Sequence, residues 1–125
     1  EVAEIAVDVP VGAEVLTGST RLKSGTAEKM ILNMISTATM VGLGKAYQNL
    51  MVDVMQTNEK LRNRAENIVM EATGVERSVA RATIDTAKGS CKVAITMILA
   101  NCSYEDAVMR LQEACGHVRE AIMEK

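Results

Sequence analysis

The chain has 125 residues with a formal net charge of −2, and 48% of them are hydrophobic, which suits a small globular protein. It contains nine Met but no Phe or Trp, so its core must be built from aliphatic side chains and Met. The balanced charge and the lack of stacking aromatic residues argue against a nucleic-acid-binding protein. No apolar run approaches the length of a membrane span, and the acidic start argues against a signal peptide.

The first predicted element is a strand over Val2–Val9, where apolar side chains alternate until Pro10. A strand cannot satisfy its own backbone N–H and C=O groups. The only other strand candidate, Leu50–Val54, is weak. We therefore expect Val2–Val9 to pair with a strand outside this chain or to lie disordered, and an unpaired edge of this kind favours association between copies.

A loop rich in small and hydroxyl residues follows, within the stretch Gly12–Met30, GAEVLTGSTRLKSGTAEKM. Such a loop before a helix suits an anion, because the first helical N–H groups lack helical partners and the helix dipole favours negative charge. We predict a phosphate or phosphosugar site with eight contact residues: Glu14, Ser19, Thr20, Arg21, Lys23, Ser24, Gly25 and Thr26. Glu14 could hydrogen-bond either the loop or the sugar. The alternative is a well-capped helix start with solvated basic residues.

The next predicted helix runs from about Leu22 to about Leu43, with apolar residues at three- and four-residue spacing, and ends at Gly42 and Gly44. Glu28, in its first turns, is explained by compensation of the helix dipole without a functional role. Residues 45–56 are apolar without a helical period and predict a buried connector packed under a sheet.

Thr57 or Asn58 is expected to cap a helix over Glu59–Thr73, and Gly74 is expected to end it. The core face of this helix is predicted to carry its apolar residues: Leu61, Ala65, Ile68, Val69 and Ala72. The solvent face is predicted to carry its charged residues: Lys60, Arg62, Arg64, Glu66 and Glu71.

From Gly74 onward the chain contains an internal repeat with a shift of 116 − 89 = 27 residues, which places Gly89 on Gly116. Each copy has the pattern helix, glycine, helix, in which the glycine ends one helix. The predicted helices are Glu76–Lys88, Cys91–Ala100, Tyr104–Cys115 and His117–Glu124, with Ser103 as an N-cap. Each copy is too small to bury its own apolar face, so we expect one compact bundle.

The cysteines, Cys91, Cys102 and Cys115, are odd in number and form no CxxC motif, and the single histidine is His117. This pattern predicts reduced, mostly buried thiols in a cytoplasmic protein rather than a metal site.

Three motifs carry a resemblance to a known family: the stretch Gly12–Met30, the run KAYQNLMVDVMQTNEKL at 45–61, and ATGV at 72–75. They are similar to N-acetylmuramic acid 6-phosphate etherases, and the first is shared with the glucokinase regulatory protein. The resemblance implies a mainly α chain. Residues 1–56 would be the end of a sugar-isomerase-type α/β domain, and residues 57–125 a helical bundle resembling a ubiquitin-associated-type module.

The resemblance also implies a function, namely the loss of D-lactate from N-acetylmuramic acid 6-phosphate by elimination and then hydration. This reaction belongs to cell-wall sugar recycling in the cytoplasm and needs no metal or redox cofactor. The family's two catalytic glutamates lie upstream of the predicted strand. No catalytic residue is therefore predicted here, and the chain alone should be inactive.

The expected partners are a sugar 6-phosphate and further copies of the chain, in a homodimer or larger assembly. Two alternatives stay open, a non-enzymatic phosphosugar sensor and a structural oligomerisation domain. For the helical bundle, the lack of an exposed aromatic or charged hot spot favours a lid or dimerisation role over a separate partner-binding surface.

Overall fold

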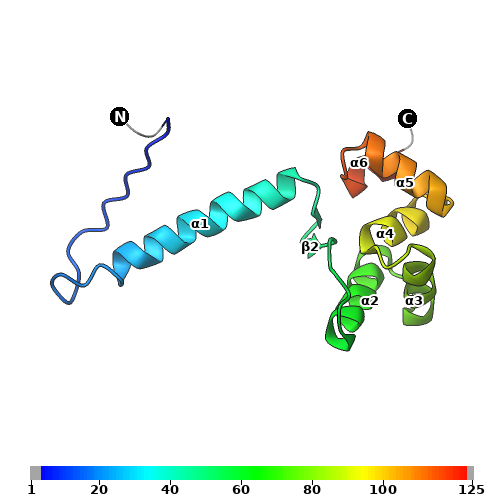
Figure 1. The fold of residues 1–125 in the computed structure, drawn as a ribbon, viewed down its shortest axis with the longest axis horizontal. Helices are drawn as coiled ribbons and strands as arrows, with labels where there is room; N and C mark the ends of the chain where they lie inside the picture. The colour runs from blue at the N-terminus through cyan, green and yellow to red at the C-terminus, as the bar shows by residue number, and fades with distance from the viewer. Residues whose placement is uncertain (1–3, 124–125) are drawn as a thin grey trace. The chain divides into compact units, whose positions relative to one another are not determined.

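The computed structural model describes residues 4–123, which form six helices and one short hairpin (Figure 1). Contacts between residues divide the chain into two compact units, Glu1–Thr39 and Met40–Lys125. The elements in chain order are α1 (Lys23–Gly42), β1 (Ala46–Tyr47), β2 (Leu50–Met51), α2 (Glu59–Thr73), α3 (Arg77–Thr86), α4 (Cys91–Leu99), α5 (Tyr104–Glu113) and α6 (Val118–Ile122).

The strand predicted at Val2–Val9 does not form over residues 4–9, and its first residues, Val2 and Ala3, lie outside the described part of the chain. The reason is the lack of a partner, because the strands among residues 4–123 are β1 and β2, which pair with each other. Apolar side chains of the predicted strand are left in solvent, with Ile5 82% and Val7 66% exposed.

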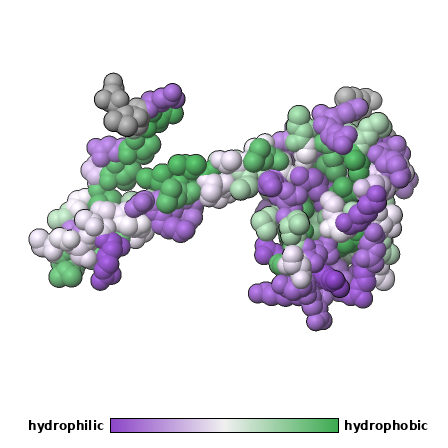
Figure 2. Space-filling view, in the orientation of Figure 1, coloured by the Kyte–Doolittle hydropathy of each residue, from purple (hydrophilic) through white to green (hydrophobic). Residues whose placement is uncertain are grey.

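Helix α1 confirms the helix predicted from about Leu22 to about Leu43, and no residue in it is buried. Its exposed side chains include Met30, Met34 and Ile35, each more than half exposed. Figure 2 shows apolar residues on the surface over this helix. The helix thus presents apolar side chains without a core to receive them.

The connector after α1 was predicted to be buried under a sheet. It is only partly buried, since Met51 is 50% and Met55 77% exposed, and it packs against a helix instead. Strands β1 and β2 pair antiparallel, with Ala46 opposite Met51 and Tyr47 opposite Leu50, and β2 contacts α2. The side chains that reach the core are Tyr47, Leu50, Val52 and Val54. This hairpin was not predicted, since Leu50–Val54 was only a weak strand candidate.

Helix α2 has the predicted limits and caps. The side chain of Asn58 accepts a hydrogen bond from the N–H of Leu61 (2.9 Å), and Gly74 ends the helix with a φ of 75°. Its residues Ala65 and Val69 are fully buried. A pattern of caps and spacing was sufficient to place this helix.

The two glycines that the predicted repeat pairs have the same backbone geometry. Gly89 and Gly116 have φ values of 85° and 84°. The N–H of Gly89 donates to the carbonyl of Ile84 (2.9 Å), and the N–H of Gly116 donates to that of Leu111 (2.7 Å). These two acceptors also lie 27 residues apart. Both glycines therefore end their helices in the same left-handed turn.

Helix α4 lies at the centre of the second unit and packs against α2, α3, α5 and α6 (Figure 1). Its Ile95 and Thr96 are completely buried. Since α4 belongs to the first copy of the repeat and is covered by both helices of the second, the copies form one bundle, as predicted. The likeness to a ubiquitin-associated-type module stays a prediction.

The turn after α1 is fixed by a close backbone contact within the second unit. A Cβ placed on Gly44, whose φ is 67°, would lie 2.6 Å from the carbonyl oxygen of Gly116. Nearby, Nε2 of His117 lies 3.2 Å from the carbonyl oxygen of Gly42. The turn at Gly44 and the turn at Gly116 are therefore in close backbone contact, which leaves no room for a side chain at Gly44.

The cysteines differ from one another in exposure. Cys91 is buried, Cys102 is partly buried and Cys115 is exposed, and all three are free thiols. The prediction of mostly buried thiols is therefore wrong for Cys115, which stands in the left-handed turn before Gly116 with a φ of 49°.

Candidate functional site

The predicted phosphosugar loop leads into the first turn of α1, and Glu14 ties the two together. The backbone N–H of Lys23 donates to Oε2 of Glu14 (3.1 Å), and that of Ser24 donates to Oε1 (3.2 Å). A carboxylate in this place satisfies two unpaired donors and compensates the helix dipole. Glu14 was predicted to hydrogen-bond either the loop or the sugar, and in the structure it bonds the end of the loop where α1 begins. It therefore acts as the N-terminal cap of α1, although it lies nine residues before the first residue of the helix.

The next two N–H groups of the turn are also occupied. Gly25 donates to the carbonyl of Thr20 (3.0 Å), and Thr26 donates to that of Leu22 (3.0 Å). The expectation that the helix start near Lys23–Thr26 offers free N–H groups to an anion is therefore wrong for this conformation. The alternative of a well-capped helix start describes the backbone.

The side chains around this turn leave an open cleft of about 600 Å³. Four of the eight predicted residues line it together: Thr20, Arg21, Gly25 and Thr26. Glu28, Lys29 and Met30 complete the lining. Lys29 was missed by sequence reasoning, although its place three residues after Thr26 puts it on the same helix face.

The other predicted residues lie elsewhere. Ser24 lines a separate hollow beside Val7 and Val9. The ammonium group of Lys23 donates to the carbonyl of Ala13 (2.7 Å), so it fastens the loop to the helix. Ser19 donates its backbone N–H to the carbonyl of Leu16 (3.0 Å) in the preceding turn. The structure thus separates residues that line the cleft from residues that hold the loop in shape.

The cleft has the charge and the donors that a phosphate needs, because Arg21 and Lys29 flank it and Thr20 adds a hydroxyl. The carboxylate of Glu28 lies in the same lining, so the cleft has both signs of charge. Such an arrangement could bind a phosphate at the cations and a sugar hydroxyl at the carboxylate.

Known proteins resemble the chain over nearly all of its length. It is 58% identical over 120 residues to an N-acetylmuramic acid 6-phosphate etherase of Geobacillus sp. (strain WCH70). The aligned residues make up 96% of this chain and 41% of that protein. The etherases of Exiguobacterium sp. and Bacillus cytotoxicus are 58% and 53% identical, over 96% and 98% of this chain.

The chain is a homologue of these etherases. The resemblance predicted from its motifs is therefore confirmed, although no family model matches the chain. The match includes the loop and α1, because it leaves out only a few of the 125 residues. The chain spans about two fifths of the length of the etherases it matches.

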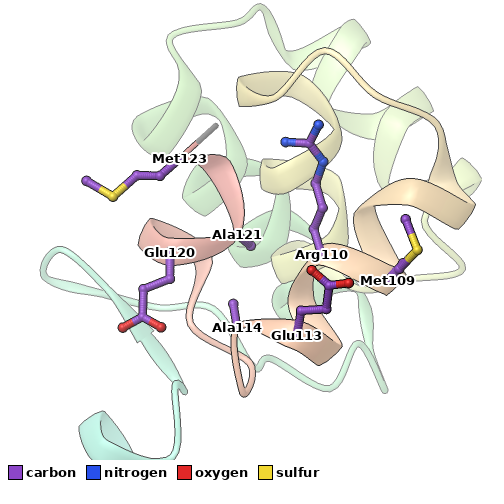
Figure 3. A pocket seen from close by; sticks show the side chains of 7 residues that line it. All are labelled: Met109, Arg110, Glu113, Ala114, Glu120, Ala121 and Met123. Atoms are coloured by element: carbon purple, nitrogen blue, oxygen red, sulfur yellow. The ribbon is translucent and has the colours of Figure 1, made fainter. Parts of the chain in front are cut away.

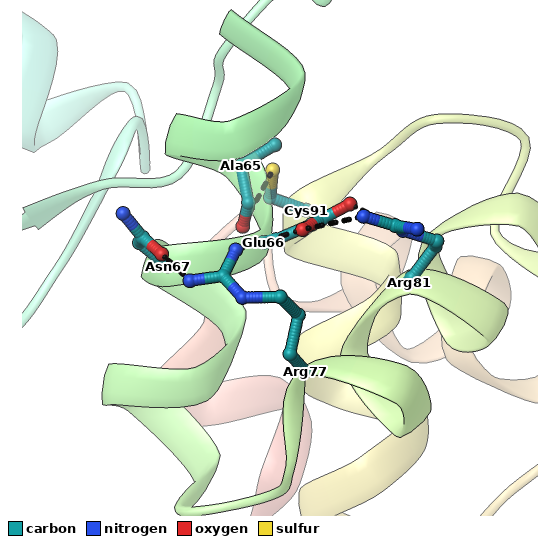
Figure 4. Close-up of polar contacts among 6 residues, drawn as sticks. All are labelled: Ala65, Glu66, Asn67, Arg77, Arg81 and Cys91. Carbon is teal, nitrogen blue, oxygen red and sulfur yellow. Dashed lines mark hydrogen bonds and ion pairs between the residues drawn. The ribbon is translucent and has the colours of Figure 1, made fainter. Parts of the chain in front are cut away.

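A second polar cluster of this etherase homologue joins α2 to α3 (Figure 4). Glu66 accepts hydrogen bonds from Nη1 of Arg77 (2.8 Å) and from Nε of Arg81 (2.7 Å), while Nη2 of Arg77 donates to Asn67 (2.6 Å). The prediction that Glu66 lies on the solvent face is wrong, because only 6% of it is exposed. The two guanidinium groups, which come from the following helix, make this burial tolerable.

The charges of this cluster stabilise one another. The hydrogen bonds from Arg81 and Arg77 lower the pKa of Glu66 below its ordinary value of 4.5. Glu66 also raises the pKa of Arg81. Since every carboxylate oxygen is occupied by an arginine, the cluster works as a clamp between two helices.

The thiol of Cys91 lies close to this clamp in Figure 4, with its Sγ 4.0 Å from the carbonyl oxygen of Ala65. Burial raises the pKa of Cys91 to about 11, which keeps the thiol protonated and unreactive at neutral pH. Among residues 4–123 no group of three or more His, Cys, Asp or Glu side chains is placed to hold a metal ion. Within the same residues, no helix is both long and apolar enough to cross a bilayer.

Proposed function

We propose that this chain is the C-terminal portion of a phosphosugar-binding lyase that cleaves the D-lactyl ether of N-acetylmuramic acid 6-phosphate. The products would be N-acetylglucosamine 6-phosphate and D-lactate, formed in the cytoplasm during cell-wall sugar recycling. The observation that carries the proposal is the match to etherases at 58% identity, whose aligned region includes the loop and α1.

In this proposal the chain contributes substrate binding, and the rest of the enzyme contributes the chemistry. The family's catalytic glutamates would belong to the part of the etherases that this chain does not cover. A positioned acid or base typically contributes about 100- to 10,000-fold to a rate. The isolated chain should therefore release no lactate at an enzymatic rate.

The phosphate would be held by side chains of the cleft rather than by the helix N-terminus, since the first N–H groups of α1 are occupied. Arg21 is the strongest candidate, because it lines the cleft and a guanidinium can donate two hydrogen bonds to a phosphate. Lys29 would add a second positive charge from α1. Glu14 and Lys23 would act indirectly by holding the loop.

The test is a comparison of binding and turnover in the protein encoded by the whole reading frame that contains this chain. Arg21→Ala should raise the dissociation constant of N-acetylglucosamine 6-phosphate about tenfold or more, because a charge-assisted hydrogen bond contributes about 1.5–3 kcal/mol. Arg62→Ala, which removes the same charge from α2, is the matched control and should leave binding unchanged.

The lactate assay separates the enzyme from its rivals. Release of D-lactate by the whole protein supports the etherase. Binding of the sugar phosphate without lactate release would identify a sensor instead. If the parent and Arg21→Ala bind the sugar phosphate with equal affinity, the cleft is not the phosphate-binding site.

A further inference from the structure

The cleft at the start of α1 contains two cations, and the ligand of the proposed function carries two negative groups. In N-acetylmuramic acid 6-phosphate the phosphate and the lactyl ether are attached at different carbons of the sugar, so the ring holds the phosphate and the lactyl carboxylate apart. The product, N-acetylglucosamine 6-phosphate, keeps the phosphate but has a hydroxyl in place of the lactyl group. A cation that meets the lactyl carboxylate would therefore recognise the substrate and not the product.

Arg21 and Lys29 line this cleft at different levels along α1. Arg21 follows Thr20, whose carbonyl oxygen accepts a hydrogen bond from the N–H of Gly25 (3.0 Å). Lys29 comes four residues after Gly25 on the same helix face, which places it about 6 Å further along the helix axis. Both side chains are exposed, so the two cations can contact separate groups of one ligand.

Both cations of the cleft are available to a ligand. Neither Arg21 nor Lys29 forms an ion pair with another of the residues 4–123. The carboxylate of the cleft belongs to Glu28, which is next to Lys29 in the sequence, and adjacent residues of a helix do not face each other. The positive charges are therefore not neutralised within the described part of the chain.

Two hollows of the second unit have a different balance of charge. The hollow between α5 and α6, of about 450 Å³, is lined by Arg110 together with Glu113 and Glu120 (Figure 3). A hollow of about 840 Å³ beside α2 and α3 has three cations and three carboxylates, namely Arg62, Arg81 and Lys88 with Glu59, Glu66 and Asp85. The cleft, with two cations and one carboxylate, suits a doubly anionic ligand better than either hollow does.

We propose that Lys29 binds the lactyl carboxylate of N-acetylmuramic acid 6-phosphate while Arg21 binds its phosphate, an inference that rests on the proposed function. Glu28 repels both anions, so it accepts a hydrogen bond from a sugar hydroxyl instead. Arg21 then contributes to the affinity for substrate and product alike, whereas Lys29 contributes to the affinity for the substrate alone. Lys29 is thus the residue that distinguishes a sugar with its lactyl group from one without it.

The test uses the protein encoded by the whole reading frame that contains this chain, and it compares two constants. The kcat/KM for D-lactate release measures recognition of the substrate, and the inhibition constant of N-acetylglucosamine 6-phosphate in the same assay measures recognition of the product. Lys29→Gln should lower kcat/KM about tenfold, mainly through a higher KM, because it removes a charge-assisted hydrogen bond. The inhibition constant should stay within about twofold of the parent value.

Three further variants serve as controls. Arg21→Gln should weaken the recognition of substrate and product by a similar factor, since both carry the phosphate. Lys29→Arg keeps the positive charge and should retain most of the parent kcat/KM. Lys60→Gln removes the same charge from an exposed position on α2 and should change neither constant. Circular dichroism of each variant verifies that it is folded.

A ligand that lacks the second charge gives an independent measurement. The lactyl amide of N-acetylmuramic acid 6-phosphate has nearly the same shape as the acid but is neutral at that group. The parent protein should use the amide with a kcat/KM about tenfold lower than that of the acid. In Lys29→Gln this preference for the acid should disappear.

Two outcomes would overturn this proposal and leave the proposed function intact. Equal losses for substrate and product in Lys29→Gln would place Lys29 at the phosphate, and no loss for either would remove it from the site. A parent protein that binds neither sugar phosphate and releases no lactate would instead overturn the proposed function, and this inference with it. The activity of the parent therefore distinguishes the two failures.

Discussion

The two units of the chain are ordered by different forces. In the first unit, Glu1–Thr39, no residue from 4 to 39 is buried. In the second unit, Met40–Lys125, α4 brings Cys91, Ala94 and Ile95 into a core that α2, α3, α5 and α6 complete. The first unit therefore depends on local hydrogen bonds, while the second has the buried apolar area that stabilises a fold.

This difference shows what helical periodicity alone provides. Helix α1 has 20 residues, but most of the stability of a helix in a protein comes from packing of its apolar face rather than from its length or propensity. Its apolar side chains have helical spacing, but they stabilise the helix only when they pack against another apolar surface. The same kind of pattern in α2 gives a stable element because the core receives Ala65 and Val69.

The largest expected contrast is in amide hydrogen exchange. Amides of α4 should exchange only on global unfolding, whereas those of α1 should exchange by local opening, so their protection should differ about a thousandfold or more. Mass spectrometry of exchange in the 125-residue chain measures both helices at once. Equal protection of α1 and α4 would contradict the view that the first unit lacks stabilising contacts.

The next largest effect is expected for Gly44→Ala, in the second unit. A Cβ there would lie 2.6 Å from the carbonyl oxygen of Gly116, a backbone atom that cannot rotate away. The positive φ adds strain, so the substitution should lower the free energy of unfolding by about 3 kcal/mol. Urea denaturation followed by circular dichroism measures this loss.

The matched control is Gly74→Ala. Gly74 has a φ of 75°, similar to that of Gly44, but a Cβ there would meet no atom within 4 Å. Its substitution should therefore cost only the strain of the left-handed conformation, about 1 kcal/mol. If the two variants lose equal stability, the close approach of the two turns does not contribute.

A smaller loss is expected for Glu66→Ala, which removes the acceptor shared by Arg77 and Arg81. The cost should be about 2 kcal/mol, below that of breaking a fully buried pair, because both arginines can turn to solvent. Glu71→Ala, an exposed change on the same helix, should cost almost nothing. Thermal denaturation of both variants tests whether the clamp is as important as its geometry indicates.

The clamp also predicts a dependence on pH. Since the pKa of Glu66 is lowered in the folded state, its contribution is fully present above the ordinary pKa of 4.5 and is lost as the pH falls through the folded value. The stability difference between the parent and Glu66→Gln should therefore shrink as the pH falls below about 4.5. A difference that stays constant down to pH 2–3 would contradict the assignment of this pKa.

These features differ in how far sequence could predict them. The limits of α2 and the turns at Gly89 and Gly116 were predictable because caps, spacing and left-handed glycines act within a few residues. The burial of Glu66 was not, because its partners Arg77 and Arg81 lie on another helix, and charged residues at such positions usually face solvent.

The first unit shows the same limit of sequence reasoning. The alternation over Val2–Val9 is a real strand signal, yet residues 4–9 form no strand because the partner is absent from the described residues. In the predicted phosphosugar loop, the residue types at Arg21 and Thr26 led to the prediction of a site. The hydrogen bonds from the N–H groups of Lys23 and Ser24 to Glu14 depend on how the loop folds back onto the helix. The spacing of these residues in the sequence does not reveal that conformation.

The smallest predicted effect concerns this loop and tests what orders the first unit. Glu14→Ala removes the acceptor of two backbone N–H groups and a favourable charge at the helix N-terminus. The loss of such a cap costs about 1 kcal/mol of helix stability. Because α1 has no core to compensate, this loss should appear as faster exchange of its first amides and lower helicity, without any change in the unfolding of the second unit.

Glu4→Ala, which removes the same charge from the segment before the loop, is the control and should change neither signal. Arg21→Ala should also leave the helix intact, because no hydrogen bond of Arg21 within residues 4–123 holds the loop. The two loop substitutions therefore separate two roles: Glu14 should act on the order of the loop, and Arg21 on the affinity for phosphate. If Glu14→Ala leaves the helicity of α1 unchanged, the cap is dispensable, and contact with the sugar becomes the better explanation for this carboxylate.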